Sequence, residues 1–136
     1  MTAPTDRDLI IRARRGAAED LADGLAAFHV DMFDHMQQLT TVTMSEFGRR
    51  ASENGSLGTD PGHGSMMMVL GGNVNGGKVH GKWPGLREGQ LIGPGDLAVT
   101  TDYRDMLSEV LIKRLHNPAT DVVFPNYESN LPGLMK

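Results

Sequence analysis

The stretch TVTMSEFGRRASENGSLGTDPGHGSMMMVLGG, residues 41–72, decides the fold. Two short runs at its ends, residues 40–45 and 65–70, predict strands, the first because it is rich in β-branched residues. The second run is apolar throughout, which is typical of a strand buried on both faces of a parallel sheet. A long polar loop joins the two runs, and loops held at both ends by strands often carry function. We therefore expect the functional site between these strands.

Helices are expected on both sides of this stretch. Residues 5–15 open with a capping threonine and predict a first helix. Residues 18–38 carry apolar side chains at alternating spacings of four and three, which predicts a longer, amphipathic helix. A third helix is expected after Thr101, which can cap it, and residues 116–118 (His-Asn-Pro) should end it.

Glycine and proline residues predict turns and loops in the remaining segments. The run GGNVNGG, residues 71–77, predicts a tight hairpin turn, with residues 78–83 as the returning strand. It lacks the spacing and the Lys-Ser/Thr pair of a phosphate-binding loop. Residues 96–100 predict a short extended segment. The tail after residue 119 is expected to pack locally and then fray.

Composition limits the classes of function. The 136 residues suit one domain, and a formal charge of −4 without a dense basic stripe argues against nucleic acid as a partner. There is no cysteine, which excludes disulfides and thiolate metal sites. No apolar run approaches the ~20 residues of a membrane-spanning helix, and the first residues lack the apolar core of a signal peptide. The sequence as written therefore predicts a cytoplasmic protein without a membrane partner.

The polar loop contains residue types that bind metals and anions. Carboxylates and imidazole are ligands for hard or borderline divalent cations, so Glu46, Asp60 and His63 are candidate metal ligands. The guanidinium of Arg49 is well matched to a phosphate or sulfate oxygen, and Asn54 is a second candidate for contact with such an anion. The alternative is structural: the glutamate pairs with a neighbouring arginine, the aspartate caps a turn, and the histidine is an ordinary loop residue.

Three segments resemble a known family. TMSEFGRR (residues 43–50), ENGSLGTDPGHGSMMMVLGGNVNGGKVHGKWPGL (53–86) and GDLAVTTDYRDMLSEVL (95–111) look like the C-terminal part of the bacterial family called domain of unknown function 1501. The similarity covers roughly residues 21–124, and residues 45–86 are its most specific part. That family is related to the sulfatases of the alkaline-phosphatase-like superfamily.

The resemblance implies an α/β fold, a partial alkaline-phosphatase-like sandwich of a few mostly parallel strands with flanking helices. Members of the superfamily hydrolyse phosphate or sulfate esters with one or two divalent metals, so a cofactor such as Zn²⁺, Mg²⁺, Mn²⁺ or Ca²⁺ and a small anionic ester substrate are implied. The ligand loops of the family correspond to segments that carry Glu46, Asp60 and His63 here. Relatives are also exported in some cases.

Two departures from the family pattern change the expectation. The family often has histidine directly after the aspartate, where this chain has Pro61. Full members are much longer, and the N-terminal half that supplies the nucleophile is missing, so residues 1–136 are expected to form a single domain that is inactive alone and has no catalytic nucleophile of its own. The chain is therefore interpreted as a fragment of a hydrolase. The alternative is a small non-catalytic module that forms a homo-oligomer through the apolar strand or binds a partner.

Overall fold

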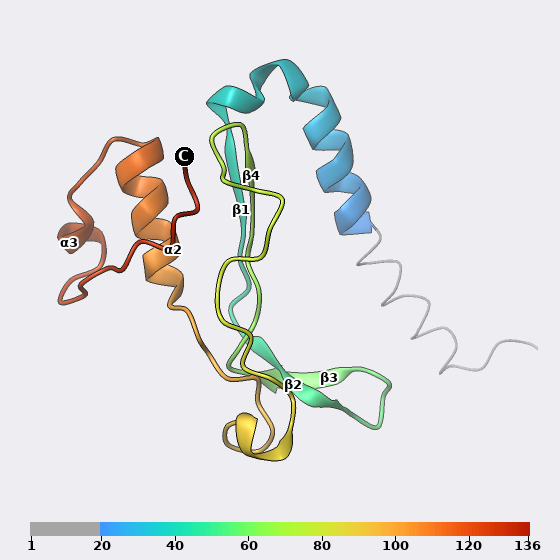
Figure 1. The fold of residues 1–136 in the computed structure, drawn as a ribbon. Coiled ribbons are helices and arrows are strands. Elements are labelled where there is room, and N and C mark those ends of the chain that lie inside the picture. Colours follow the sequence, from blue (N-terminus) through green and yellow to red (C-terminus); the bar gives the residue numbers. More distant parts are fainter. Residues whose placement is uncertain (1–19) are drawn as a thin grey trace, which may run out of the picture.

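A computed structural model describes residues 20–136 (Figure 1). The helix expected over residues 5–15 lies outside the described residues. Residues 20–31 are helical, and the described elements that follow are η1 (Phe33–Gln38), β1 (Thr40–Thr43), β2 (Gly48–Glu53), β3 (Thr59–Gly62), β4 (Met68–Gly71), η2 (Glu88–Gln90), α2 (Tyr103–Glu109), η3 (Val110–Arg114) and α3 (Thr120–Val123). The amphipathic helix predicted over residues 18–38 is thus an α-helix continued by a 3-10 helix.

The sheets are antiparallel, so the predicted α/β fold with mostly parallel strands is wrong. One two-stranded sheet pairs β1 with β4, and the other pairs β2 with β3. Thr40 lies opposite Gly71, and Thr43 lies opposite Met68. Parallel strands need a crossover connection, usually a helix. Here β1 and β4 are connected by the β2–β3 hairpin and not by a crossover helix. Strand β4 therefore runs antiparallel to β1.

The methionine-rich run is not buried on both faces. Met66 is 75% exposed and Met68 is 38% exposed. A two-stranded sheet has no neighbouring strands and few elements to cover it, so its apolar side chains stay open to solvent. The existence of both strands was predicted correctly, but their partner and their burial were not.

The polar loop contains a second hairpin that sequence reasoning missed. Strands β2 and β3 pair Gly48 with Gly62 and Arg49 with Pro61, and the register shifts before Glu53. The carboxamide oxygen of Asn54 accepts hydrogen bonds from two backbone N–H groups of the turn, at 3.0 and 3.1 Å. Such a side-chain bond stabilises a tight turn. Figure 1 shows this hairpin projecting beyond the β1–β4 ribbon.

Two glycines allow three backbone segments to meet at the base of this hairpin. A Cβ atom at Gly48 would lie 2.0 Å from the carbonyl oxygen of Gly64, and one at Gly64 would lie 2.5 Å from that of Leu97. Only a residue without a side chain tolerates such close backbone contact.

Helix α2 begins one residue later than predicted. Its cap is Asp102, whose carboxylate accepts a hydrogen bond from the backbone N–H of Arg104 at 2.9 Å. Side-chain hydrogen bonds from Arg104 outweigh burial and hold the pKa of Asp102 below its ordinary value. The same guanidinium lies 3.7 Å from the ring centroid of Tyr127, whose hydroxyl donates to Asp105. Burial, followed by that hydrogen bond, raises the pKa of Tyr127 to about 12.

The C-terminal tail forms the core rather than fraying. Leu134 and Met135 are each 3% exposed and pack with Val74. Val74 forms a β-bridge with Met135, so the chain just after β4 pairs with the tail. The predicted strand over residues 78–83 is absent from the described structure.

A buried carboxylate fixes this tail to α2. Glu109 is fully buried and accepts hydrogen bonds from the backbone N–H groups of Gly133, Leu134 and Met135 at 2.7–3.0 Å. Lys113 lies 2.9 Å from the same carboxylate and also donates to the carbonyl of Met135. Figure 1 shows the red C-terminal segment running back beside α2, the orange helix.

Candidate functional site

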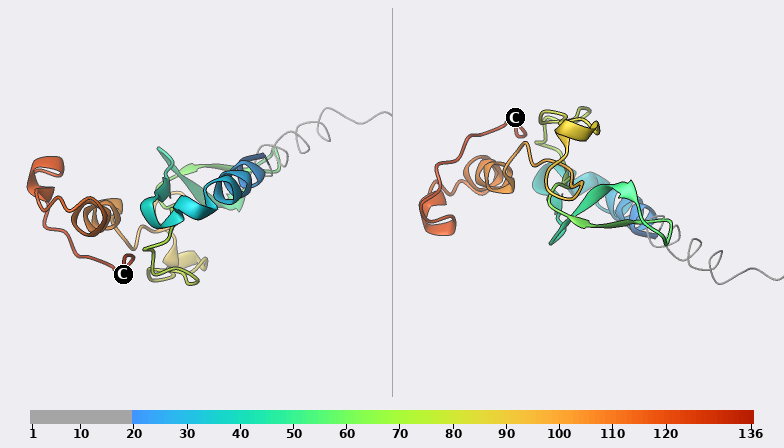
Figure 2. Two further views of the ribbon diagram at one scale, coloured as in Figure 1. Left: turned by 90° about the horizontal axis from the view of Figure 1, so that it is seen from above. Right: turned by 90° about the horizontal axis from the view of Figure 1, so that it is seen from below.

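The candidate site lies where residues 95–97 pass the base of the β2–β3 hairpin. The N–H of Ala51 donates to the carbonyl of Gly95 at 3.0 Å, and the N–H of Gly64 donates to that of Leu97 at 3.0 Å. These bonds fix the intervening Asp96 against the hairpin. Figure 2 shows from below how the loop of residues 88–100 reaches the hairpin.

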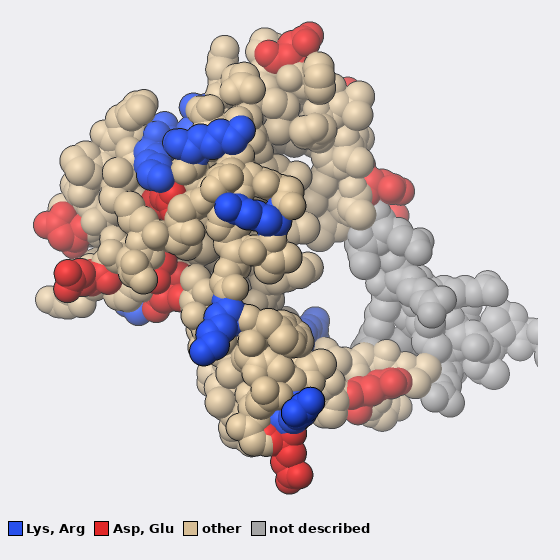
Figure 3. Space-filling model, in the orientation of Figure 1, with Lys and Arg blue, Asp and Glu red and all other residues tan. Residues whose placement is uncertain are grey.

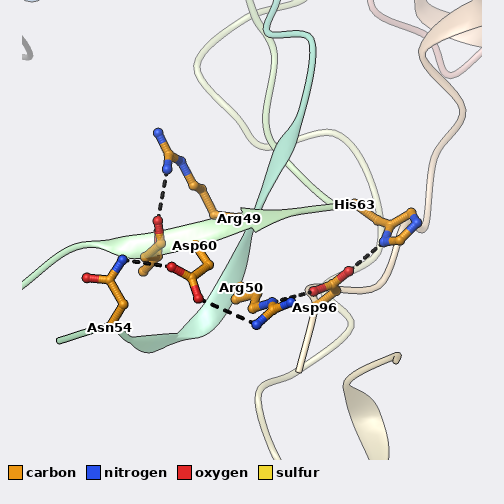
Figure 4. A network of polar contacts seen from close by, with 7 residues as sticks. Arg49, Arg50, Asn54, Asp60, His63 and Asp96 are labelled. Atoms are coloured by element: carbon orange, nitrogen blue, oxygen red, sulfur yellow. Dashed lines mark hydrogen bonds and ion pairs between the residues drawn. The ribbon is translucent and has the colours of Figure 1, made fainter. Parts of the chain in front are cut away.

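Asp96 is a buried carboxylate that lies between Arg50 and His63 in Figure 4. Its side chain is 5% exposed, and its Oδ2 lies 2.5 Å from Nδ1 of His63. Its Oδ1 lies 3.4 Å from Nε of Arg50, an ion pair that lacks hydrogen-bond geometry. A buried carboxylate is tolerated only when it is paired in this way. Sequence reasoning missed Asp96, because nothing in the local pattern links it to a histidine 33 residues away.

The pairing with Asp96 orients the imidazole of His63. A carboxylate accepts hydrogen bonds, so Nδ1 is the donor and the neutral ring has its lone pair on Nε2. The side chain of His63 is 71% exposed. Histidines that bind metals, or that act as bases, are commonly held by a carboxylate on the other ring nitrogen. The structure thus presents an oriented, accessible imidazole.

The other predicted ligands have different surroundings. Asp60 accepts a hydrogen bond from the amide nitrogen of Asn54 at 2.9 Å and lies 3.5 Å from Nη1 of Arg50. Its side chain remains 49% exposed. Glu46 is exposed in the bend between β1 and β2. Arg50 therefore bridges Asp60 and Asp96, which places Asp60 and His63 on either side of one guanidinium (Figure 4).

The predicted anion-binding residues take part in the hairpin itself. Arg49 is exposed, donates from Nη1 to the carbonyl of Thr59 at 2.9 Å, and lies 5.1 Å from the ring centroid of Phe47. Asn54 uses its carboxamide oxygen in the turn and its nitrogen on Asp60. Both residues stabilise the β2–β3 hairpin. An anion would have to compete for their donor groups with the hydrogen bonds of the hairpin.

The donors do not gather into one ligand set in this structure. Among residues 20–136, no group of three or more His, Asp or Glu side chains is placed to hold a metal ion. The structure brings Asp60 and His63 to one hairpin and leaves Glu46 before it. The assignment of these three residues as metal ligands remains a prediction.

Fold and site define a small protein of antiparallel hairpins and short helices that presents a carboxylate-held histidine at its surface. The chain belongs to the family described as protein of unknown function (DUF1501), whose model matches residues 9–119. The family part of the sequence-based resemblance is therefore confirmed. Comparisons with curated proteins and with solved structures gave no match.

Over residues 20–136, none of the helices combines the length and apolar character needed to cross a bilayer.

Proposed function

We propose that this chain contributes donor groups to a metal-dependent hydrolase of phosphate or sulfate esters, of the sulfatase-like kind found in the alkaline-phosphatase-like superfamily. One observation carries the proposal: buried Asp96 holds Nδ1 of His63, whose exposed imidazole is left with Nε2 to bind a metal. Family membership adds support, because the ligand loops implied by the resemblance lie in the matched region.

Roles follow from where each side chain lies. His63 and Asp60 are proposed as ligands from the β2–β3 hairpin, and Glu46 as a ligand from the bend before it. Arg49 is proposed to meet an ester oxygen, since its guanidinium is exposed and positively charged. Asn54 can contact such an oxygen only through its amide nitrogen, which already donates to Asp60.

The set is incomplete for catalysis. Because the three ligands do not form one group among the described residues, we derive no catalytic step through a metal. A bound divalent cation would polarise an ester oxygen and stabilise its developing charge. The residues assigned here would bind and orient, and the nucleophile must come from outside them.

A thermal unfolding experiment tests this proposal. We expect one of Zn²⁺, Mg²⁺, Mn²⁺ or Ca²⁺ to raise the Tm relative to EDTA, because a ligand of the folded state alone stabilises it by about 2.7 kcal/mol at a hundred times its Kd. His63→Ala and Asp60→Ala should abolish the rise, whereas the matched control His29→Ala, on the exposed helix, should keep it. Aryl phosphate and sulfate esters should not be turned over. A Tm unaffected by all four metals would contradict the ligand assignment, and turnover lost in Asp60→Ala would contradict the claim of an incomplete site.

A second candidate function is a non-catalytic module that associates with another protein surface. Exposure of large apolar side chains favours it: among the described residues, Val79 is 96% exposed, and Phe33 and Val30 are each 71% exposed. In the part of the chain that the structure describes, the buried apolar residues are Met36, Val74, Leu134 and Met135. Over residues 20–136, more large apolar side chains are therefore exposed than buried, as expected of a protein that buries them on association.

A further inference from the structure

Two exposed segments of the chain are complementary in charge. Residues 20–39, the acidic segment, contain four aspartates and no lysine or arginine. Residues 78–87, the basic segment, contain Lys78, Lys82 and Arg87 and no acidic residue. All of these charged side chains are exposed. Figure 3 shows basic side chains over the middle of the molecule, and acidic ones at the top and right, where the helix of residues 20–31 lies, as well as at the left and the bottom.

Each segment also exposes apolar side chains between its charges. In the acidic segment, Leu21 is 58% exposed and Phe28 is 42% exposed. They share one helix face, because positions seven apart are two turns apart. In the basic segment, Val79 is 96%, Trp83 69% and Leu86 55% exposed. An apolar surface rimmed by charge is typical of a protein interface.

The two segments do not cover each other within one chain. Figure 1 shows the blue helix of residues 20–31 standing apart from the strands. The basic segment has no regular structure but is held in place, since His80 donates from Nε2 to the carbonyl of Asn75 at 3.0 Å and Thr100 donates to the carbonyl of Lys82 at 2.7 Å. It is therefore presented as a fixed surface.

We infer that a second copy of this chain is the partner of both surfaces. In a two-fold dimer, the acidic segment of each copy would pack on the basic segment of the other. The same contact then forms twice, and both segments of both copies are covered. Aspartates would then face lysines across the interface, which gives the contact its specificity and its register. Pairing two acidic segments would instead place like charges together, which disfavours the alternative helix-to-helix dimer.

Analytical ultracentrifugation of the full chain with EDTA tests this inference apart from the metal proposal. We expect a dimer at low ionic strength that weakens as salt rises. Asp20→Lys/Asp31→Lys and Lys78→Glu/Lys82→Glu should each weaken dimerisation roughly tenfold or more, since each places like charges in contact. An equimolar mixture of the two variants should restore the dimer, because both contacts are again complementary.

The mixture also separates a lost interface from a lost fold, because misfolded variants would not recombine. As a matched control, Asp121→Lys changes an exposed aspartate outside both segments and should leave the dimer unchanged. Wild-type protein that stays monomeric at every concentration would overturn the inference and direct attention to another protein as the partner. Folded variants that fail to recombine would also overturn it.

Discussion

Replacing Glu109 by Ala is expected to lower the free energy of unfolding by about 3–5 kcal/mol. The carboxylate is fully buried and binds three consecutive N–H groups, those of Gly133, Leu134 and Met135. Its removal leaves these three donors without their acceptor and deprives the ammonium of Lys113 of its carboxylate partner. Residues 133–135, which supply two of the buried apolar side chains, would then lose their hydrogen bonds to α2.

Urea unfolding measures this effect. The matched control is Glu88→Ala, which removes an exposed glutamate in η2 and should change stability by no more than about 0.5 kcal/mol. A loss below about 1 kcal/mol in Glu109→Ala would mean that the tail does not depend on this carboxylate. Hydrogen exchange at Leu134 and Met135 should rise in the variant before global unfolding.

The same group predicts a pH dependence. Burial raises the pKa of Glu109, but the N–H groups of the tail and Lys113 outweigh it and hold the pKa below the ordinary value of 4.5. A group whose folded-state pKa is lowered stabilises fully above its unfolded value and loses this contribution as the pH falls through the folded value. The difference in stability between wild type and Glu109→Ala should therefore be constant at neutral pH and shrink below about pH 4.5.

Replacing Asp96 by Ala is expected to cost about 2–3 kcal/mol and to abolish any response to metal. Asp96 is 5% exposed and holds both His63 and Arg50. Its loss leaves Nε of Arg50 unpaired in a buried position and lets the imidazole rotate. Arg50 itself is one-third exposed, which moderates the cost.

Urea unfolding and the metal-dependent Tm separate the two consequences. Asp96→Asn keeps the volume of the side chain and one acceptor oxygen, so it should be more stable than Asp96→Ala. Its metal-dependent rise in Tm should nevertheless be smaller than that of the wild type. Asp121→Ala is the control, because that aspartate is exposed in the first turn of α3. Full metal response in Asp96→Ala would show that this carboxylate does not position the ligand.

Local patterns predicted the elements better than their partners. The strands near residues 40 and 68 follow from β-branched and apolar runs, and the helix after residue 102 follows from its cap and apolar spacing. Whether β4 is parallel or antiparallel to β1 depends on the path of the chain between them. That path is the β2–β3 hairpin, whose sequence, GRRASE against TDPG, has no apolar alternation and contains a proline.

Polar contacts between residues far apart in the sequence could not be predicted either. Asp60 and His63 could be singled out because they lie together in a polar loop. Asp96 follows a Gly-Pro-Gly turn and looks like a turn residue, and Glu109 looks like a polar position on a helix. Each becomes informative only when a segment 24 to 33 residues away is brought against it. Pairing over such separations has no local signature.

The most direct test of the proposed site is the imidazole tautomer of His63, with and without metal. A long-range ¹H–¹⁵N spectrum near neutral pH should show His63 with its proton on Nδ1, because Asp96 accepts it. His80 is an internal reference, since its Nε2 faces the carbonyl of Asn75 and must carry the proton. Addition of Zn²⁺ should shift Nε2 of His63 and leave His80 unchanged. A His63 protonated on Nε2, or one that Zn²⁺ does not affect, would contradict the assignment of this residue as an Asp96-oriented metal ligand.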